Sequence, residues 1–198
     1  MKKLLDIADR LLGENGCPWD KKQTFHSLQP YLTEEVHEVL EAVDENNDKK
    51  IVEELGDLLY NIVFYAKLGE TQGRFTWDDI VENISNKLIY RHPHIFGDAK
   101  AMTADEVVDI YEKAKSQEKG KEERKHPLDG IPPTLPLLVR AQKVLRKITK
   151  EKVKETISEE EIASELLSIV SKANNSGVDL ESTLRRALTT LENQFRKE

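Results

Sequence analysis

The sequence predicts an all-α protein, and three observations lead to that fold class. Apolar residues recur at the three- and four-residue spacing of amphipathic helices through most of the 198 residues. Capping residues and short polar turns separate these segments. No stretch keeps the strict apolar–polar alternation of a half-buried strand. The apolar content of 38% is low but sufficient for the core of a helical bundle.

The first predicted helix lies at the amino terminus and ends at Gly13 or Gly16. Acidic residues interrupt its apolar run, so we do not expect it to be a signal peptide. Segment 17–31 follows as a turn-rich connector, in which Pro18 and Pro30 exclude the interior of a helix.

Two long helices follow the connector, over about residues 32–44 and 50–70. The polar turn "DENNDKK" between them has the length expected between antiparallel helices. Thr76 is the predicted N-cap of the next helix, with acidic residues in its first turn. Thr103, with a glutamate three residues later, has the spacing of a capping box and opens another helix.

The carboxy-terminal part begins after two segments of unusual composition. Nine of the 13 residues from Lys113 to Lys125 are Lys, Arg or Glu, which predicts a solvated helix tail or a flexible linker. The proline-rich segment 126–136 cannot be regular, and a helix restarts after it. Residues 137–198 echo the first half: "ELGDLLYNIVFYAKL" is echoed by "EIASELLSIVSKANN", which keeps the apolar positions and loses the acids. Chance similarity between two amphipathic helical pairs is the alternative explanation.

Charge and cysteine content exclude several classes of function. A net charge of −7 argues against binding to the nucleic-acid backbone as the main function. The single cysteine, Cys17, allows no intrachain disulfide and fits a reducing, cytoplasmic setting. No apolar stretch is long enough to predict a membrane span.

The two long helices each carry a pair of acids beside an apolar stripe. At 100° per residue, Glu35 and Glu38 lie about 60° apart on the flank of the first stripe. Glu54 and Asp57 have the same angular offset on the second helix, and Asn61 continues their line. If the helices pack antiparallel, both acid pairs converge on one point. The stripes consist of Val36, Val39, Leu40 and Val43 on the first helix and Leu55, Leu58, Leu59 and Ile62 on the second.

Four carboxylates at close range repel one another unless cations neutralise them. Hard oxygen ligands suit Mg²⁺, with Mn²⁺ as a substitute, and such a metal would bind phosphates. A salt-bridged helix surface is the alternative for a chain with this many charges. A di-iron bundle would need two Glu-x-x-His motifs, and only Glu34 and His37 form one. Phe64 and Tyr65 extend the acidic line, which suits cover by a partner subunit or by residues 137–198.

Several motifs of the chain occur together in one known family. "EEVHE" followed by "EELGD" is similar to the EExxE…ExxD signature of the MazG family of nucleoside triphosphate pyrophosphohydrolases. The segments "GCPWDKKQTFHSL", "KLIYRHPHIFGD", "EKAKSQEK" and "LDGIPPTLPLLVRAQK" resemble its amino-terminal domain in order and spacing. The resemblance implies a catalytic helical domain over 1–125, a linker over 126–136 and a truncated, degenerate second copy over 137–198.

The same resemblance implies Mg²⁺-dependent hydrolysis of a nucleoside triphosphate to a monophosphate and pyrophosphate, by attack of a metal-activated water, in a homodimer. The implied metal ligands are Glu35, Glu38, Glu54 and Asp57, and Glu34 or Glu38 would accept the proton of the water. A non-catalytic helical regulatory or interaction module derived from such an enzyme is the alternative.

Substrate contacts are expected outside the acidic pairs. Lys87 and Arg91 match the family's phosphate-binding Lys and Arg, and their spacing puts both on one helix face. An internal ion pair with the acids is the alternative for these two. Tyr111 stands where the family commonly has Trp and can still stack on a base. Trp19 is a further candidate for stacking, although a role in the core or in anchoring the loop fits it equally.

Overall fold

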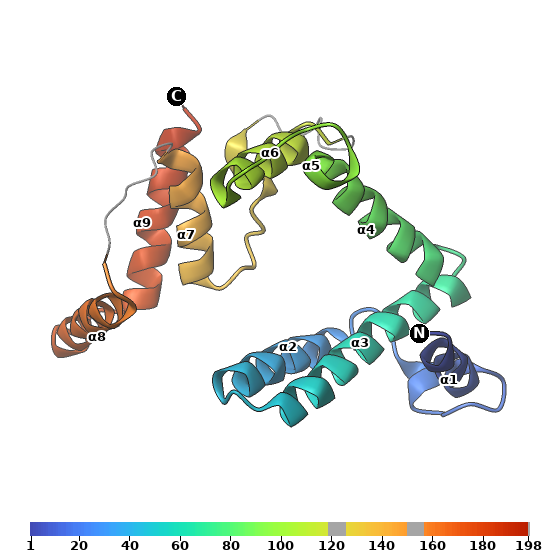
Figure 1. Ribbon diagram of the computed structural model, residues 1–198. Helices are drawn as coiled ribbons and strands as arrows, with labels where there is room; N and C mark the ends of the chain where they lie inside the picture. Colours follow the sequence, from blue (N-terminus) through green and yellow to red (C-terminus); the bar gives the residue numbers. More distant parts are fainter. Residues whose placement is uncertain (119–125, 150–156, 198) are drawn as a thin grey trace. The chain divides into compact units, whose positions relative to one another are not determined.

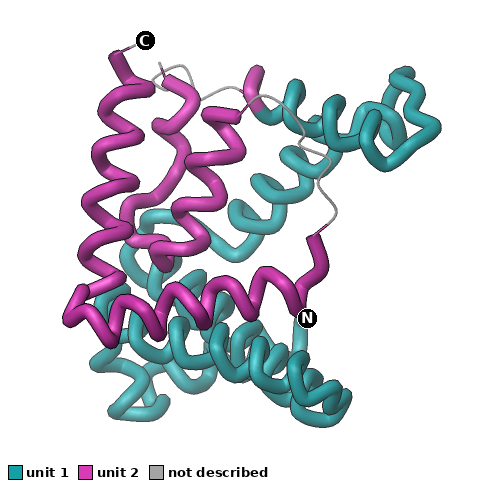
Figure 2. The backbone as a smooth tube through the Cα atoms, turned by 90° about the vertical axis from the view of Figure 1, so that its left-hand side faces the viewer, with its two compact units in different colours: residues 1–115 teal, residues 116–198 magenta. Residues whose placement is uncertain are grey.

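The computed structural model describes residues 1–118, 126–149 and 157–197, and no strand occurs among them. This confirms the predicted all-α class. The chain divides into two compact units, residues 1–115 and 116–198, which Figure 2 colours separately. No helix within the described ranges is both long and apolar enough to cross a membrane.

Helices make up the first unit, and their order follows the sequence closely (Figure 1). They are α1 (Lys2–Leu12), the 3₁₀ turn η1 (Asp20–Lys22), α2 (Gln29–Asp44), α3 (Asp48–Thr71), α4 (Trp77–Arg91), α5 (Pro93–Phe96) and α6 (Ala104–Ser116). The prediction placed the start of α2 three residues too late. Pro30 lies in the first turn of α2, where a proline breaks no helical hydrogen bond.

Helices α2 and α3 form an antiparallel hairpin that positions the acidic residues (Figure 1). Asn46 adopts a positive φ of 51° in the short turn between them, a conformation that asparagine tolerates better than most residues. The Asn47 side chain then accepts a hydrogen bond from the backbone N–H of Lys50 and caps α3. These local signals fix where α3 begins, and therefore the register of its acids against those of α2.

The core of the first unit lies at the carboxy-terminal half of α3, away from the turn. Leu28, Phe64 and Leu68 are buried there, with Phe25 and Tyr65 packed against them. The Tyr65 hydroxyl donates a hydrogen bond to the backbone carbonyl of Phe25 over 3.2 Å. The connector before α2 therefore covers Phe64 and Tyr65, so neither a partner subunit nor residues 137–198 is needed for that purpose.

A capped corner joins α3 to α4. Thr76 and Asp79 form the capping box at the start of α4, and Glu70 accepts a hydrogen bond from the N–H of Trp77. Glu70 also pairs with the buried Lys67 at 2.8 Å. The N-cap predicted at Thr76 is confirmed, and the same corner ties α4 to the end of α3.

The second unit contains η2 (Pro127–Gly130), α7 (Leu137–Ile148), α8 (Glu159–Asn175) and α9 (Leu180–Phe195). Leu128, Ala141, Val144 and Leu188 form its buried cluster. The proline-rich segment 126–136 is irregular apart from the short turn η2, as predicted. Most of the remaining charged linker, residues 119–125, lies outside the described residues.

Candidate metal centre

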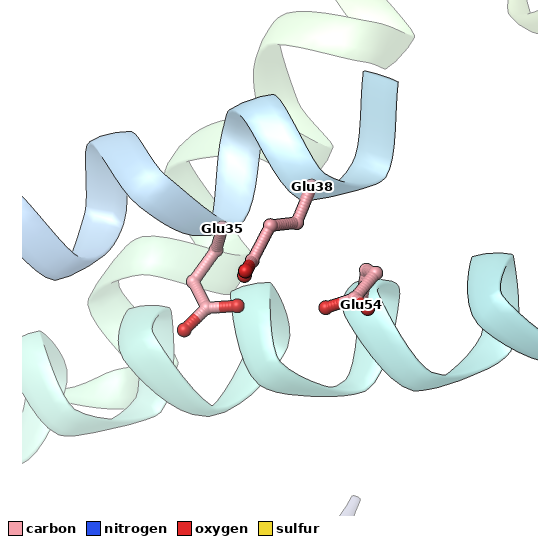
Figure 3. A group of neighbouring side chains, drawn as sticks. All are labelled: Glu35, Glu38 and Glu54. Carbon is pink, nitrogen blue, oxygen red and sulfur yellow. The ribbon is translucent and has the colours of Figure 1, made fainter. Parts of the chain in front are cut away.

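Three of the four predicted metal ligands meet between α2 and α3. One carboxylate oxygen from each of Glu35, Glu38 and Glu54 lies within 4.8 Å of the other two (Figure 3). Glu35 and Glu38 are three residues apart on α2 and share one face of that helix, and Glu54 reaches the same point from α3. We call Glu35, Glu38 and Glu54 the glutamate cluster.

The electrostatics of the glutamate cluster reflect its crowded negative charge. Burial, followed by the charges of Asp57, Glu38 and Glu54, raises the pKa of Glu35 above its ordinary value of 4.5. Burial and the neighbouring carboxylates, Glu38 first, also raise the pKa of Glu54, while Lys50 partly opposes this effect. A divalent cation would remove the repulsion between these groups, and its preferred ligands are carboxylate oxygens. The residues present therefore fit a divalent cation that prefers oxygen ligands.

Asp57 lies beside the glutamate cluster without being one of its mutually close members. It is exposed on α3, and its charge is the largest coulombic contribution to the raised pKa of Glu35. Glu34, the other acid of the signature, is exposed on α2. Asn61 is buried one turn after Asp57, and its side-chain amide donates to the Asp57 backbone carbonyl over 3.2 Å.

The basic residues lie apart from the glutamate cluster within the chain. Lys87 and Arg91 belong to the carboxy-terminal half of α4, and Figure 1 shows that end of α4 away from the α2–α3 hairpin. Both side chains are half-buried. The Arg91 guanidinium donates from Nη1 to the hydroxyl of Tyr111 on α6 over 2.8 Å. Sequence reasoning missed this contact, because no local pattern links residues twenty positions apart.

Trp19 is 52% exposed, so a role in the core is wrong for it. Its ring contacts Tyr31 edge-on, with the ring centroids 5.8 Å apart. Trp77, the other tryptophan, is half-buried at the start of α4. Trp19 therefore presents an open aromatic face on the connector before α2, whereas Trp77 belongs to the corner between α3 and α4.

The predicted apolar stripes of α2 and α3 are largely uncovered in the single chain. Leu40 is 54% exposed and Val43 is 52% exposed on α2, and Leu55 is 48% exposed on α3. Ile84 and Leu88 on α4 are also exposed. Periodicity identified the apolar faces of these helices correctly, but it carries no information about what covers them.

Comparison with known proteins gives a consistent result. Residues 23–96 match the model of the MazG nucleotide pyrophosphohydrolase domain. A nucleoside triphosphate pyrophosphohydrolase of Escherichia coli is 37% identical, over 98% of this chain and 85% of the relative. A protein of Thermotoga maritima named nucleoside triphosphate pyrophosphohydrolase/pyrophosphatase MazG is 36% identical, over 99% of this chain and 84% of its own.

A solved structure extends the likeness to the fold. The crystal structure of a MazG-related protein from Thermotoga maritima superposes with a TM-score of 0.52 at 28% identity. The superposition covers 59% of this chain and 99% of the chain of that protein. The matched domain spans α2, α3 and α4, which carry the glutamate cluster and the two basic residues. The chain therefore belongs to the MazG family of nucleotide pyrophosphohydrolases.

Proposed function

We propose that this protein hydrolyses nucleoside triphosphates to a nucleoside monophosphate and pyrophosphate, with Mg²⁺ as its metal ion. The observation that supports this most strongly is the glutamate cluster, which gathers three carboxylates from two helices in a chain of this family. Carboxylates that raise one another's pKa repel when ionised, which does not favour a merely structural surface. A bound cation would neutralise this repulsion.

Each acidic residue of the signature, and each of the two basic residues on α4, has a role in this proposal. Carboxylates of the glutamate cluster and of Asp57 would hold Mg²⁺, or Mn²⁺ in its place. Once bound, the cation would supply charge neutralisation and a more acidic water for hydrolysis. Glu34 or Glu38 would accept the proton of the attacking water. Lys87 and Arg91 would bind the phosphates and stabilise the departing pyrophosphate.

A direct test is product analysis with purified full-length protein, Mg²⁺ and a panel of nucleoside triphosphates. Pyrophosphate and monophosphate should appear together, and chelation of Mg²⁺ should stop the reaction. Glu38→Gln and Glu54→Gln should each lower kcat/KM by more than the roughly 10–100-fold that is typical when only a partner of a metal ligand is lost. Glu82→Gln, at an exposed position of α4, is the matched control and should leave the rate unchanged.

The alternative function, a non-catalytic regulatory or interaction module, predicts a different result. It would give no pyrophosphate with any nucleotide, although the protein is folded. Release of a nucleoside diphosphate and orthophosphate would contradict the proposed reaction while leaving a nucleotide-binding role in place.

We also propose that the protein is a homodimer, packed through the exposed apolar faces of α2 and α3. Leu40, Val43 and Leu55 lie on these faces, and contiguous exposed apolar residues on a single chain are typical of protein interfaces. Leu40→Glu should convert the dimer to a monomer in sedimentation velocity. A wild-type protein that sediments as a monomer at micromolar concentration would refute the dimer.

The proposed dimer also offers a way for α4 of one copy to reach the glutamate cluster of the other. Two variants, Glu54→Gln and Arg91→Ala, test this directly, because each should be inactive alone. If the site forms between copies, mixing and re-equilibrating the two variants should restore part of the activity. Mixed variants that stay inactive, in a mixture shown to exchange subunits, would place each site within one chain.

We propose that residues 137–198 derive from a truncated second copy that has lost its acids, on the support of the apolar echo between the two halves. The single cysteine and the negative net charge support a cytoplasmic location and a role that does not involve nucleic acid.

A further inference from the structure

Tyr111 contacts Arg91, and this contact has no role in the reaction proposed above. Its hydroxyl accepts a hydrogen bond from Arg91 Nη1 over 2.8 Å, and the guanidinium carbon lies 5.4 Å from the centroid of the Tyr111 ring. Both distances are within the range of favourable interaction. Together they restrain the position and the direction of a side chain that otherwise has many rotamers.

The Tyr111 ring is itself held by the end of α4. The His92 ring packs edge-on against it, with centroids 5.5 Å apart. His92 is fixed in turn, because its Nδ1 lies 2.7 Å from the backbone carbonyl of Leu88. A carbonyl only accepts hydrogen bonds, so Nδ1 carries the proton that is donated. The half-buried Tyr111 is therefore a restrained group, able to hold Arg91 rather than move with it.

Restraint of an arginine matters for anion binding. An arginine that is free to rotate loses side-chain entropy when it closes on a phosphate, whereas one that is already held loses less. Tyrosine differs from phenylalanine and tryptophan by its hydroxyl, which can accept a hydrogen bond from an arginine. A phenylalanine has no acceptor, and the indole nitrogen of a tryptophan only donates.

We propose that Tyr111 is a positioning residue, whose hydroxyl holds the Arg91 guanidinium in place to bind the polyphosphate of the substrate. This inference rests on the proposed function, and it gives Tyr111 a role different from the base stacking expected from the sequence. A stacking residue acts on the base, while a residue that positions Arg91 acts on the phosphates. The two roles are therefore separable with a ligand that has no base.

The experiment uses Tyr111→Phe and Tyr111→Trp in the full-length protein, with inorganic tripolyphosphate as the probe. Binding in the presence of Mg²⁺ is measured by titration calorimetry, and kcat and KM are measured for one nucleoside triphosphate. Loss of a charge-assisted hydrogen bond should weaken tripolyphosphate binding about tenfold in both variants. KM should rise by a similar factor, and kcat should also fall, because the misplaced Arg91 would stabilise the departing pyrophosphate less well.

A double-mutant cycle with Arg91→Lys shows whether Tyr111 acts through Arg91. Lysine keeps the positive charge and lacks the guanidinium fork. Adding Tyr111→Phe to Arg91→Lys should cause little further loss of tripolyphosphate affinity, whereas two independent contributions would add. Full additivity, in variants with unchanged thermal unfolding, would overturn the inference.

Base stacking would give the opposite pattern. Tyr111→Trp would then bind nucleotide as well as the wild type, and neither variant would lose affinity for tripolyphosphate. Failure of the wild type to bind tripolyphosphate would also overturn the inference. Wild-type protein that releases no pyrophosphate, yet binds tripolyphosphate with an affinity that depends on the Tyr111 hydroxyl, would refute only the proposed function.

Discussion

Replacing Glu35 by glutamine should stabilise the metal-free protein and remove its stabilisation by Mg²⁺. Burial and the surrounding carboxylates raise the pKa of Glu35 in the folded protein above 4.5, so its ionised form is disfavoured there. The contribution of such a group to stability is fully present below its unfolded-state pKa and is lost as the pH rises through the folded value. At pH 7 the charge on Glu35 therefore opposes folding, and glutamine removes that opposition.

The geometry sets the size of the effect. Charges 4.8 Å apart, the upper limit of the separations within the glutamate cluster, repel by about 0.9 kcal/mol in a water-like dielectric, a value that already allows for solvent screening at this partly exposed site. We therefore expect Glu35→Gln to raise the free energy of unfolding by about 1 kcal/mol without metal, or Tm by roughly 2–4 °C. Wild-type protein should gain about 2.7 kcal/mol when Mg²⁺ is at a hundred times its Kd, and the variant should lose most of this gain.

Thermal unfolding followed by circular dichroism measures both effects, with chelator and with added Mg²⁺. The difference between variant and wild type should be largest at pH 7 and should shrink below pH 4.5, where Glu35 is protonated in both states. Glu82→Gln is the control and should change neither quantity. A variant that is less stable than wild type in chelator, with an unchanged response to Mg²⁺, would refute the assignment of Glu35 to a metal centre.

Two further predictions concern stability outside the glutamate cluster. Gly69→Ala should destabilise the protein by about 1–2 kcal/mol in urea unfolding: the added Cβ would lie 2.6–2.8 Å from ring carbons of Phe75, and this overpacking outweighs the gain in helix propensity. Gly56→Ala in the same helix meets no atom within 4 Å and should stabilise by up to about 1 kcal/mol, so equal effects at the two glycines would contradict the packing argument. In the second unit, the side chain of Arg196 and then the backbone N–H of His126 lower the pKa of Asp129 below 3.8. The stabilisation that ionised Asp129 contributes to folding is present above pH 3.8 and is lost as the pH falls through the lowered pKa. Asp129→Asn should therefore flatten the dependence of stability on pH in that acidic range. An unchanged dependence, measured by calorimetry, would refute the contact.

Helix boundaries were predictable because their signals are local. Thr76 with Asp79, and Thr103 with Glu106, cap their helices as the spacing indicates. One error, the start of α2, came from treating Pro30 as a helix breaker. A proline in the first turn lacks only an N–H that would have no intrahelical partner, so it is compatible with a helix that begins at Gln29.

The candidate site was predictable in part. Three-residue spacing placed Glu35 and Glu38 on one face, and an antiparallel hairpin brought Glu54 to them, as expected. Asp57 lies nearby rather than inside the mutually close group, because helical angles do not fix side-chain rotamers or the tilt between two helices. Apolar periodicity likewise identified the faces of α2 and α3 without showing that both would be exposed in a single chain.

The sequence by itself determined the helical class, most helix ends and the family, because caps, periods and motifs are properties of short segments. Only the tertiary structure decided which groups meet: Glu54 with Glu35 across the hairpin, and Arg91 with Tyr111 across α4 and α6. Such meetings depend on how helices pack and on which rotamers that packing allows. Residues far apart along the chain carry no local signal of their contact.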